Sequence, residues 1–161
     1  MQQQSKFPFR GQGQLDWQLK KFDELTVAEL YAILQLRNEV FVLEQNCPYQ
    51  DADNKDQKSL HFMGWDGGTL VAYSRIIPQG ISYTEASIGR VVTNPKYRGI
   101  GAGKQLMQLS ISNTLQQFNC TQIKIGAQLY LKKFYEALGF VQCSDQYLED
   151  NIPHIEMLLT K

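Results

Sequence analysis

Alternating glycines occupy one short segment of the chain, where a predicted strand meets a predicted helix. The segment reads Arg98-Gly99-Ile100-Gly101-Ala102-Gly103-Lys104. Glycine adopts left-handed backbone conformations without the steric penalty of a Cβ atom, so several unpaired N–H groups can point to one place. Such groups, together with the dipole of the following helix, bind phosphate oxygens, and Arg98 and Lys104 would add positive charge at the rim. The segment predicts a phosphate-binding turn, with a merely flexible turn as the alternative.

Two common phosphate-binding motifs do not fit this segment. A P-loop reads G-x-x-x-x-G-K-S/T, but counting back from Gly103 puts Arg98 at its first glycine and Gln105 at its hydroxyl position. A dinucleotide fingerprint reads G-x-G-x-x-G, and its last glycine would fall on Lys104. We therefore expect neither a P-loop nor a Rossmann dinucleotide site here.

Two motifs in the same order resemble those of a known superfamily. The pattern R-x-x-G-x-G, formed by Arg98, Gly101 and Gly103 after a V-V-T strand end, resembles the acetyl-CoA pyrophosphate loop of the GNAT N-acetyltransferases. The pattern Y-x-x-x-G-F, from Tyr135 to Phe140, resembles the motif that usually closes their cofactor region. The resemblance implies acetyl-CoA as cosubstrate, no metal, and acetyl transfer to an amine by direct attack on the thioester.

Three further segments resemble the ElaA-type acetyltransferases of that superfamily. They read L-R-N-E-V-F-V-L-E-Q-N-C-P-Y-Q-D-A-D from Leu36 to Asp53, S-I-G-R-V-V from Ser87 to Val92, and Y-L-E-D-N-I-P-H-I-E-M from Tyr147 to Met157. The resemblance covers residues 15–161, which we expect to form one N-acetyltransferase domain after an N-terminal arm at residues 1–14. One departure is Gln128, because the superfamily often has Asn seven residues before the motif tyrosine.

The resemblance also implies how the cofactor is held. The strand end at Val91, Val92 and Thr93 would splay away from the next strand and pair its free backbone groups with pantetheine; simple core packing is the alternative for the two valines. The expected cofactor-binding residues are Val91, Val92, Thr93, Arg98, Gly99, Ile100, Gly101, Ala102, Gly103, Lys104 and Gln128.

Acetyl transfer needs a neutral amine and a proton for the departing thiolate. An alkylamine has a pKa of about 10.4 and a thiol one of about 8.5, so acid and base groups assist both proton transfers. The resemblance makes Tyr135 the candidate acid, because a phenol stays protonated at neutral pH and can donate. The alternative is a half-buried tyrosine with its hydroxyl in water.

The candidate bases are Glu85 and His154. Glu85 lies thirteen residues before Arg98 on the expected fourth strand, where many relatives carry a glutamate base. The pKa of an ordinary histidine, about 6.5, suits proton removal by His154. Either residue could instead be structural, and a chain of water molecules could replace both. His61 is expected to face away from the core as a structural residue.

Acidic residues gather after the first predicted helix, at Glu44, Asp51, Asp53 and Asp56. In the GNAT superfamily this region commonly walls the acceptor site, so the resemblance implies an acidic wall that attracts a cationic amine. A solvated loop is the alternative. Cys47 is not expected to be a nucleophile, since no histidine lies nearby in sequence and direct transfer needs none.

The elements that must position these residues alternate between strands and helices. A capping box at Thr26–Glu29 opens the first helix, which should end near Gln45, and D-G-G after Trp65 joins two strands as a hairpin. Asn119 should cap the second helix, which follows the glycine turn. The expected strands are 15–19, 59–65, 69–77, 83–93, 122–127, 140–147 and 152–159, and a short third helix covers 130–138. The order β-α-β-β-β-α-β-α-β-β predicts an α/β fold with a mixed sheet, as in the GNAT acyl-CoA N-acyltransferases.

Length and charge narrow the class of protein. The 161 residues suffice for one domain, and equal numbers of basic and acidic residues, 16 each, argue against a nucleic-acid binder that depends on overall basicity. The three cysteines lie far apart and suggest neither a disulfide framework nor paired zinc ligands. No apolar run is long enough for a bilayer and the N-terminus has no signal-peptide core, so no membrane association and a cytoplasmic location are expected.

The expected function is therefore acetyl transfer from acetyl-CoA to an unidentified small-molecule or peptide amine, with a homodimer left open. Two other functions remain alternatives. One is an acyl-CoA-binding or sensing module without turnover, and the other is a binder of nucleotide phosphates.

Overall fold

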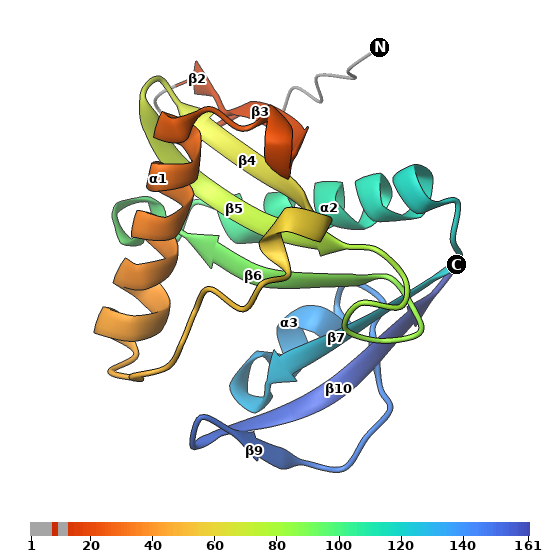
Figure 1. The fold of residues 1–161 in the computed structure, drawn as a ribbon. Coiled ribbons are helices and arrows are strands. Elements are labelled where there is room, and N and C mark those ends of the chain that lie inside the picture. The colour runs from red at the N-terminus through yellow and green to blue at the C-terminus, as the bar shows by residue number, and fades with distance from the viewer. Residues whose placement is uncertain (1–7, 10–12) are drawn as a thin grey trace.

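Two four-stranded antiparallel sheets that meet at one corner form the body of the fold, and a two-stranded sheet, β1-β2, precedes them in the described residues (Figure 1). The computed structural model describes residues 8–9 and 13–161. The strands are β1 (Pro8–Phe9), β2 (Gly13–Gln14), β3 (Asp16–Lys21), β4 (Leu60–Asp66), β5 (Thr69–Ile77), β6 (Ser87–Thr93), β7 (Gln122–Gln128), β8 (Val141–Gln142), β9 (Tyr147–Glu149) and β10 (Ile152–Thr160). The helices are α1 (Val27–Arg37), α2 (Ala102–Phe118) and α3 (Lys132–Glu136), with a π-helical segment η2 (Asn38–Glu44) and short 3-10 turns η1 (Phe22–Glu24), η3 (Asp56–Lys58), η4 (Pro95–Tyr97) and η5 (Leu129–Leu131).

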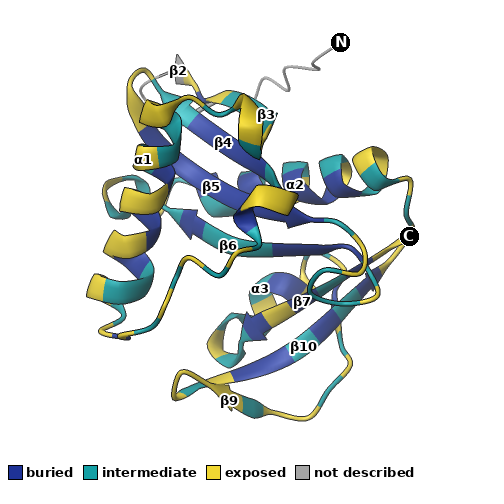
Figure 2. Ribbon diagram, viewed as in Figure 1, coloured by how far each residue is buried: buried dark blue, intermediate teal, exposed yellow. Residues whose placement is uncertain are grey.

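The N-terminal sheet has the strand order β3-β4-β5-β6 and lies between two helices. Neighbouring residues on a strand point to opposite faces, so Phe62 packs towards α2 and Met63 towards α1. The outer face of α1 is exposed and its inner face is buried against the sheet (Figure 2). Both faces of this sheet therefore contribute to the core.

The C-terminal sheet is built around the long strand β10, which pairs with β7, β8 and β9. One face packs under α3, where Ile125 and Met157 join Tyr135 and Phe140 in a buried cluster. On the neighbouring strands β10 and β7 of this sheet, His154 lies directly opposite Gln128.

The first helix begins at the predicted capping box. Glu29 N donates to Thr26 Oγ1 at 3.1 Å, and Thr26 N donates to Glu29 Oε2 at 2.9 Å. After Arg37 the helix continues as the π-helical segment η2, for which Gln45 is the C-cap, as expected from the sequence. Such segments are rare and often occur beside functional sites. The cap of α2 at Asn119, in the left-handed conformation, is also confirmed.

The structure corrects three expectations about the sheet. The predicted strand at 140–147 is broken into β8 and β9, and the strand expected from residue 83 begins only at Ser87. A parallel neighbour to β6 was expected, but within the described residues β7 pairs with it only at the bridge between Ala86 and Ile123. The predicted arm at residues 1–14 lies largely outside the described residues. Its described part consists of Pro8–Phe9 and Gly13–Gln14, which pair with each other as β1 and β2. No helix within the described part is both long and apolar enough to cross a membrane.

Candidate active site

The two sheets separate between β6 and β7. These strands run parallel, and Lys124 N donates to Ala86 O at 2.9 Å beside the Ala86–Ile123 bridge. Beyond this corner no strand pairing joins β6 and β7 in the described part of the chain, and the strands diverge towards their carboxyl ends (Figure 1). Both are edge strands of their sheets, so each offers backbone N–H and C=O groups to a ligand between them.

A β-bulge bends β6 on the way to this opening. Between the pairs Tyr73–Val92 and Arg75–Gly89, β5 contributes a single residue and β6 contributes two, Arg90 and Val91. Arg90 has a φ of 50°, in the left-handed region. A non-glycine residue in this conformation costs roughly 1–2 kcal/mol, and a bulge increases the local twist of its strand. The bulge thus aims the end of β6 away from β7.

The glycine turn follows the end of β6 and starts α2. Gly99 and Gly101 both have a φ of 82°, and a Cβ atom at either would meet no heavy atom within 4 Å. Gly101 is the N-cap of α2, and Gln105 N donates to Gly101 O at 3.1 Å. In an α-helix the preceding N–H groups, from Ala102 to Lys104, have no partner within the helix. The turn is therefore an open cradle of N–H groups suited to a diphosphate.

The rest of the expected cofactor residues lie around this turn. A Cβ atom at Gly103 would lie 3.7 Å from Thr93 Cγ2, so the turn packs directly on the end of β6. Ile100 and Ala102 pack against the core cluster between the N-terminal sheet and α2, and Lys104 is exposed on the first turn of α2. Val92 is 3% exposed and packs towards α1, as the core-packing alternative expected, while its backbone lies in the open edge of β6.

Arg98 forms an ion pair with Glu44 at the end of η2. Arg98 Nη1 lies 2.6 Å from Glu44 Oε1, and the two side chains are 44% and 41% exposed. Glu44 was expected beside the amine and Arg98 beside the phosphates. The structure instead brings the two residues together at the edge of the glycine turn.

Tyr135 is more deeply buried than a half-exposed helix tyrosine. It is 7% exposed and makes edge-to-face contacts with Phe134 and Phe140, at centroid distances of 5.1 and 5.9 Å. It shares a core cluster with Ala127 on β7, against which Val91 of β6 also packs. Burial raises the pKa of the Tyr135 phenol to about 12, so at neutral pH the hydroxyl keeps its proton. Among the described residues this hydroxyl has no hydrogen-bond partner, which leaves it available as a donor.

His154 and Gln128 lie opposite each other on β10 and β7. His154 Nδ1 lies 2.7 Å from the Ile152 carbonyl oxygen, which can only accept, so Nδ1 donates this hydrogen bond. Nε2 lies 3.4 Å from Glu149 Oε2. Gln128 Nε2 donates to Gln45 Oε1 at 3.2 Å, so its side chain reaches towards the end of η2.

Glu85 lies in the loop before β6, next to the bridge residue Ala86. Its carboxylate raises the pKa of nearby Lys124 as one of several contributions, the largest being the hydrogen bond to Glu156. Glu85 and Val91 are six positions apart, a separation of roughly 20 Å if the chain between them were fully extended. The structure thus places the two candidate bases at opposite ends of the opening between β6 and β7.

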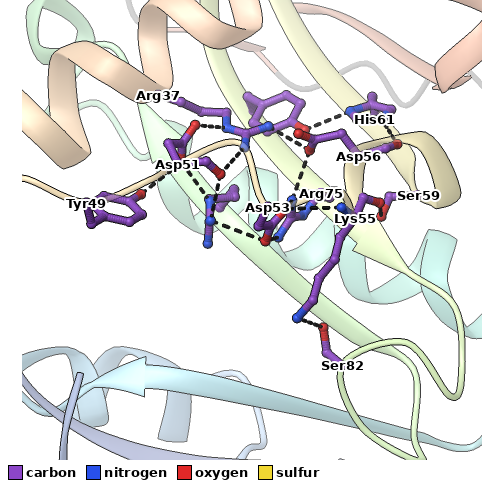
Figure 3. A network of polar contacts seen from close by, with 12 residues as sticks. Arg37, Tyr49, Asp51, Asp53, Lys55, Asp56, Ser59, His61, Arg75 and Ser82 are labelled. Carbon is purple, nitrogen blue, oxygen red and sulfur yellow. Dashed lines mark hydrogen bonds and ion pairs between the residues drawn. The ribbon is translucent and has the colours of Figure 1, made fainter. Parts of the chain in front are cut away.

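The three aspartates after η2 form neither a free acidic wall nor a solvated loop. Figure 3 shows that guanidinium groups surround them, so their charge is neutralised inside the protein. The pairing arginines come from the end of α1, from β5 and from the bulge of β6; they are Arg37, Arg75 and Arg90.

The contacts in this network are short and shared. Arg37 Nε donates to Asp51 Oδ2, and Arg37 Nη1 to Asp56 Oδ1, both at 2.8 Å. Arg75 donates to both carboxylate oxygens of Asp53, from Nη1 to Oδ1 at 2.7 Å and from Nη2 to Oδ2 at 2.8 Å. Its Nη1 also donates to Asp56 Oδ1 at 2.9 Å. Arg37 is 0% and Arg75 2% exposed. Burial alone would raise the pKa of Asp53 and Asp56, but the hydrogen bonds from the guanidinium groups hold both pKa values below the ordinary range.

His61 also joins this network, contrary to the expectation that it faces away from the core. It is 0% exposed, its Nε2 lies 2.9 Å from the Asp56 carbonyl oxygen, and its Nδ1 lies 2.8 Å from the Tyr73 hydroxyl. The carbonyl only accepts, so Nε2 donates and Nδ1 accepts from Tyr73. Burial lowers the pKa of His61, which fits a neutral structural residue.

A family model described as an acetyltransferase (GNAT) domain matches residues 24–161 of the chain. The chain belongs to the GNAT acetyltransferase family. Its glycine turn and its diverging strands β6 and β7 thus lie inside a GNAT domain.

Relatives of the same size share most of the chain. The protein ElaA of Escherichia coli is 41% identical over 145 residues, which cover 89% of this chain and 95% of ElaA. A UPF0039 protein of Schizosaccharomyces pombe is 42% identical over 147 residues, covering 90% of this chain and 97% of that protein.

Solved structures agree with this grouping. The chain is similar to a crystal structure named an acyl-CoA N-acyltransferase from Pseudomonas aeruginosa, with a TM-score of 0.87, 42% identity, and coverage of 91% of this chain and 99% of that one. The crystal structure of Escherichia coli ElaA gives a TM-score of 0.85 at 40% identity, covering 90% and 99%. The fold is therefore that of the GNAT acyl-CoA N-acyltransferases, and the resemblance noted in the sequence is confirmed.

Sequence reasoning missed several residues of the site. Arg90 lies within a segment that resembles the ElaA-type proteins, but an arginine on a strand carries no signal for a left-handed conformation. Arg37, Arg75 and Gln45 were missed because their partners are distant in sequence.

Proposed function

We propose that the protein is an N-acetyltransferase that moves the acetyl group of acetyl-CoA to a primary amine by direct attack of the amine on the thioester. The observation that carries this proposal is that the glycine turn directly follows β6 at the end where β6 and β7 are no longer paired. A ligand with a diphosphate at the turn and an extended arm along β6 fits this arrangement as one continuous molecule.

The chain's own backbone would hold that ligand. The N–H groups at the start of α2 would bind the diphosphate, and the open edge of β6 at Val91–Thr93 would pair with the amides of the pantetheine arm as an added strand does. Holding thioester and amine together can supply up to about 7–11 kcal/mol of the barrier reduction. Positioning by backbone groups is therefore the main catalytic contribution we propose.

Two side chains would move protons. Tyr135, protonated at neutral pH and buried in the cluster that contains Ala127 of β7 and contacts Val91 of β6, would donate to the departing thiolate. We assign proton removal from the amine to His154 rather than Glu85, because His154 lies opposite Gln128 beside the open ends of the strands, whereas Glu85 lies at the joined corner. Comparing the pH profiles of His154→Ala and Glu85→Gln tests this assignment, since only the loss of the base removes its limb of the profile.

The donor and the acceptor are parts of the proposal. The family description supports an acetyl group, while the similar Pseudomonas aeruginosa protein is named more broadly as an acyl-CoA N-acyltransferase. The acceptor is proposed as a primary amine on a small molecule or a peptide.

Release of the thiol from acetyl-CoA in the presence of a panel of amines tests the activity. Tyr135→Phe removes only the hydroxyl and keeps the ring contacts with Phe134 and Phe140. We expect kcat to fall by about 10²-fold or more, with the affinity for acetyl-CoA and the melting temperature nearly unchanged.

Two results would replace the proposal. If acetyl-CoA binds but no amine releases the thiol, the protein is a sensing module without turnover. If ATP displaces CoA and magnesium strengthens that displacement, it is a binder of nucleotide phosphates.

A further inference from the structure

Arg90 has a backbone conformation that is unusual for its residue type. Six described residues other than glycine have a positive φ, and five of them are Asn or Asp, which tolerate this region. Arg90 is the exception, and it lies within a strand. A strained residue of this kind persists only when its surroundings hold it in place.

The side chain of Arg90 is held by the loop that follows η2. Its Nε donates to Asp51 Oδ1 at 2.8 Å, and its Nη2 donates to the Asp51 carbonyl oxygen at 3.0 Å and to Asp53 Oδ2 at 3.3 Å. Its guanidinium carbon lies 5.6 Å from the centre of the Tyr49 ring, whose hydroxyl donates to Asp51 Oδ1 at 2.8 Å. Four groups therefore fix one guanidinium.

The two aspartates are themselves fixed to the core. Asp51 accepts from Arg37 at the end of α1, and Asp53 accepts from Arg75 on β5. Both arginines are almost fully buried, so each aspartate is tied to a second guanidinium in the core besides that of Arg90. Figure 3 shows the loop, α1 and the strands converging on this one cluster.

The conformation of Arg90 sets the direction of the residues that follow. Val91 shares the bulge with Arg90, and Val92 resumes pairing with Tyr73 on β5. If the residue at position 90 returned to the extended conformation, the open edge of β6 at Val91–Thr93 would point in a different direction relative to β7.

We infer that Arg90 is a positioning residue: its ion pairs with Asp51 and Asp53 hold the left-handed bulge and so place the β6 backbone that receives the acyl-pantetheine arm. This inference rests on the proposed function, since it concerns the same site. Arg90 acts through the backbone and is not required to touch the thioester.

The test uses two variants that lose the same side-chain contacts. Arg90→Ala and Arg90→Gly both remove the guanidinium, but only alanine has a Cβ atom that disfavours the left-handed conformation. Calorimetry would measure binding of acetyl-CoA and of adenosine 3′,5′-bisphosphate, a probe of the nucleotide half alone.

We expect Arg90→Ala to bind acetyl-CoA about tenfold more weakly than Arg90→Gly, the ratio set by the cost of the left-handed conformation. Binding of adenosine 3′,5′-bisphosphate should be the same in both variants, because the nucleotide does not reach the bulge. In the turnover assay kcat should fall by roughly 10²-fold in Arg90→Ala and recover substantially in Arg90→Gly.

Equal acetyl-CoA affinities for Arg90→Ala and Arg90→Gly would overturn the inference, because the backbone conformation would then be irrelevant. An equal loss of adenosine 3′,5′-bisphosphate binding would also overturn it, since that would indicate a general loss of structure. If Arg90→Ala fails to fold, Arg90→Asn and Arg90→Gln form a second matched pair, because Asn tolerates the left-handed region better than Gln.

These binding measurements need no turnover. A protein that releases no thiol with any amine, yet shows the expected difference between Arg90→Ala and Arg90→Gly, would refute the proposed function and support the positioning role. Turnover with no difference between the two variants would do the reverse.

Discussion

The site depends on the conformation of single residues whose side chains take no part in the chemistry. Gly99 and Gly101 turn the chain from β6 into α2 with a φ of 82° each. The space that a side chain at either position would enter is open in the structure. At both positions glycine is therefore required by the backbone, and the empty space beside it is available to a ligand.

Replacing Gly101 by valine should abolish CoA binding, because the new side chain would occupy the space of the diphosphate. Gly80 provides a matched control, since its φ is 83° and a Cβ atom there also meets nothing within 4 Å. Both Gly101→Val and Gly80→Val suffer the same backbone strain. We expect only Gly101→Val to lose CoA affinity in calorimetry, while both melt at lower temperature. Equal CoA affinity in Gly101→Val and the wild type would contradict the assigned turn.

At the scale of elements, the end of η2 crosses the open side of the splayed strands. Glu44 contacts Arg98 of the glycine turn, Gln45 contacts Gln128 at the end of β7, and Cys47 Sγ lies 3.6 Å from the carbonyl oxygen of Asp150 in the β9–β10 turn. Three of the four positions 44–47 thus touch elements on both sides of the opening.

The pair between Glu44 and Arg98 should compete with a diphosphate for the same guanidinium. Exposed ion pairs of this kind are worth about 0–1 kcal/mol, so Glu44→Gln should tighten CoA binding by up to roughly fivefold. The gain should shrink at high salt, which screens exposed charges. Glu136→Gln, which removes the exposed pair with Lys132 on α3, is the control and should leave CoA affinity unchanged. Weaker CoA binding by Glu44→Gln would contradict this competition.

Elements with local signals were predictable from the sequence. The capping box at Thr26, the left-handed cap at Asn119 and the hairpin between β4 and β5 depend on neighbouring residues, and all three are confirmed. The end of the predicted strand at 140–147 was not predictable at its β8 part, because β8 pairs with Met157 and Leu158, fifteen or more positions further along the chain. Pairing with a distant strand leaves no pattern in the segment itself.

In the molecule as a whole the net charge is zero, and several of its aspartates and arginines pair with one another inside the fold. The glycine turn could be located from the sequence because its glycines and its arginine are neighbours there. The ion pairs of the acidic loop were not predictable from the sequence, because Arg75 and Arg90 lie more than twenty residues beyond Asp53 and Arg37 lies before it on α1. From the sequence alone, a cluster of aspartates therefore suggests an exposed acidic surface, because its arginine partners can be identified only in the folded structure.

This network should make the stability of the protein fall in acid. The guanidinium groups hold the pKa values of Asp53 and Asp56 below those of the unfolded chain, which are about 3.9. As the pH falls below about 5, the unfolded chain takes up protons before the folded protein does, so the free energy of unfolding decreases. The stabilisation is present in full at neutral pH and is lost progressively as the folded carboxylates become protonated. Urea unfolding between pH 7 and pH 3 measures this loss.

The variant Asp53→Asn separates the network from acid effects elsewhere. At pH 7 it should be less stable by about 1–3 kcal/mol, because Arg75 is 2% exposed and loses one of its two carboxylate partners. Its stability should then fall less steeply between pH 5 and pH 3, since one carboxyl group with a lowered pKa is gone. Asp145→Asn, at an exposed position, is the matched control and should follow the wild-type curve. If Asp53→Asn and Asp145→Asn have parallel acid curves, the ion pairs of Asp53 do not govern the acid sensitivity of the fold.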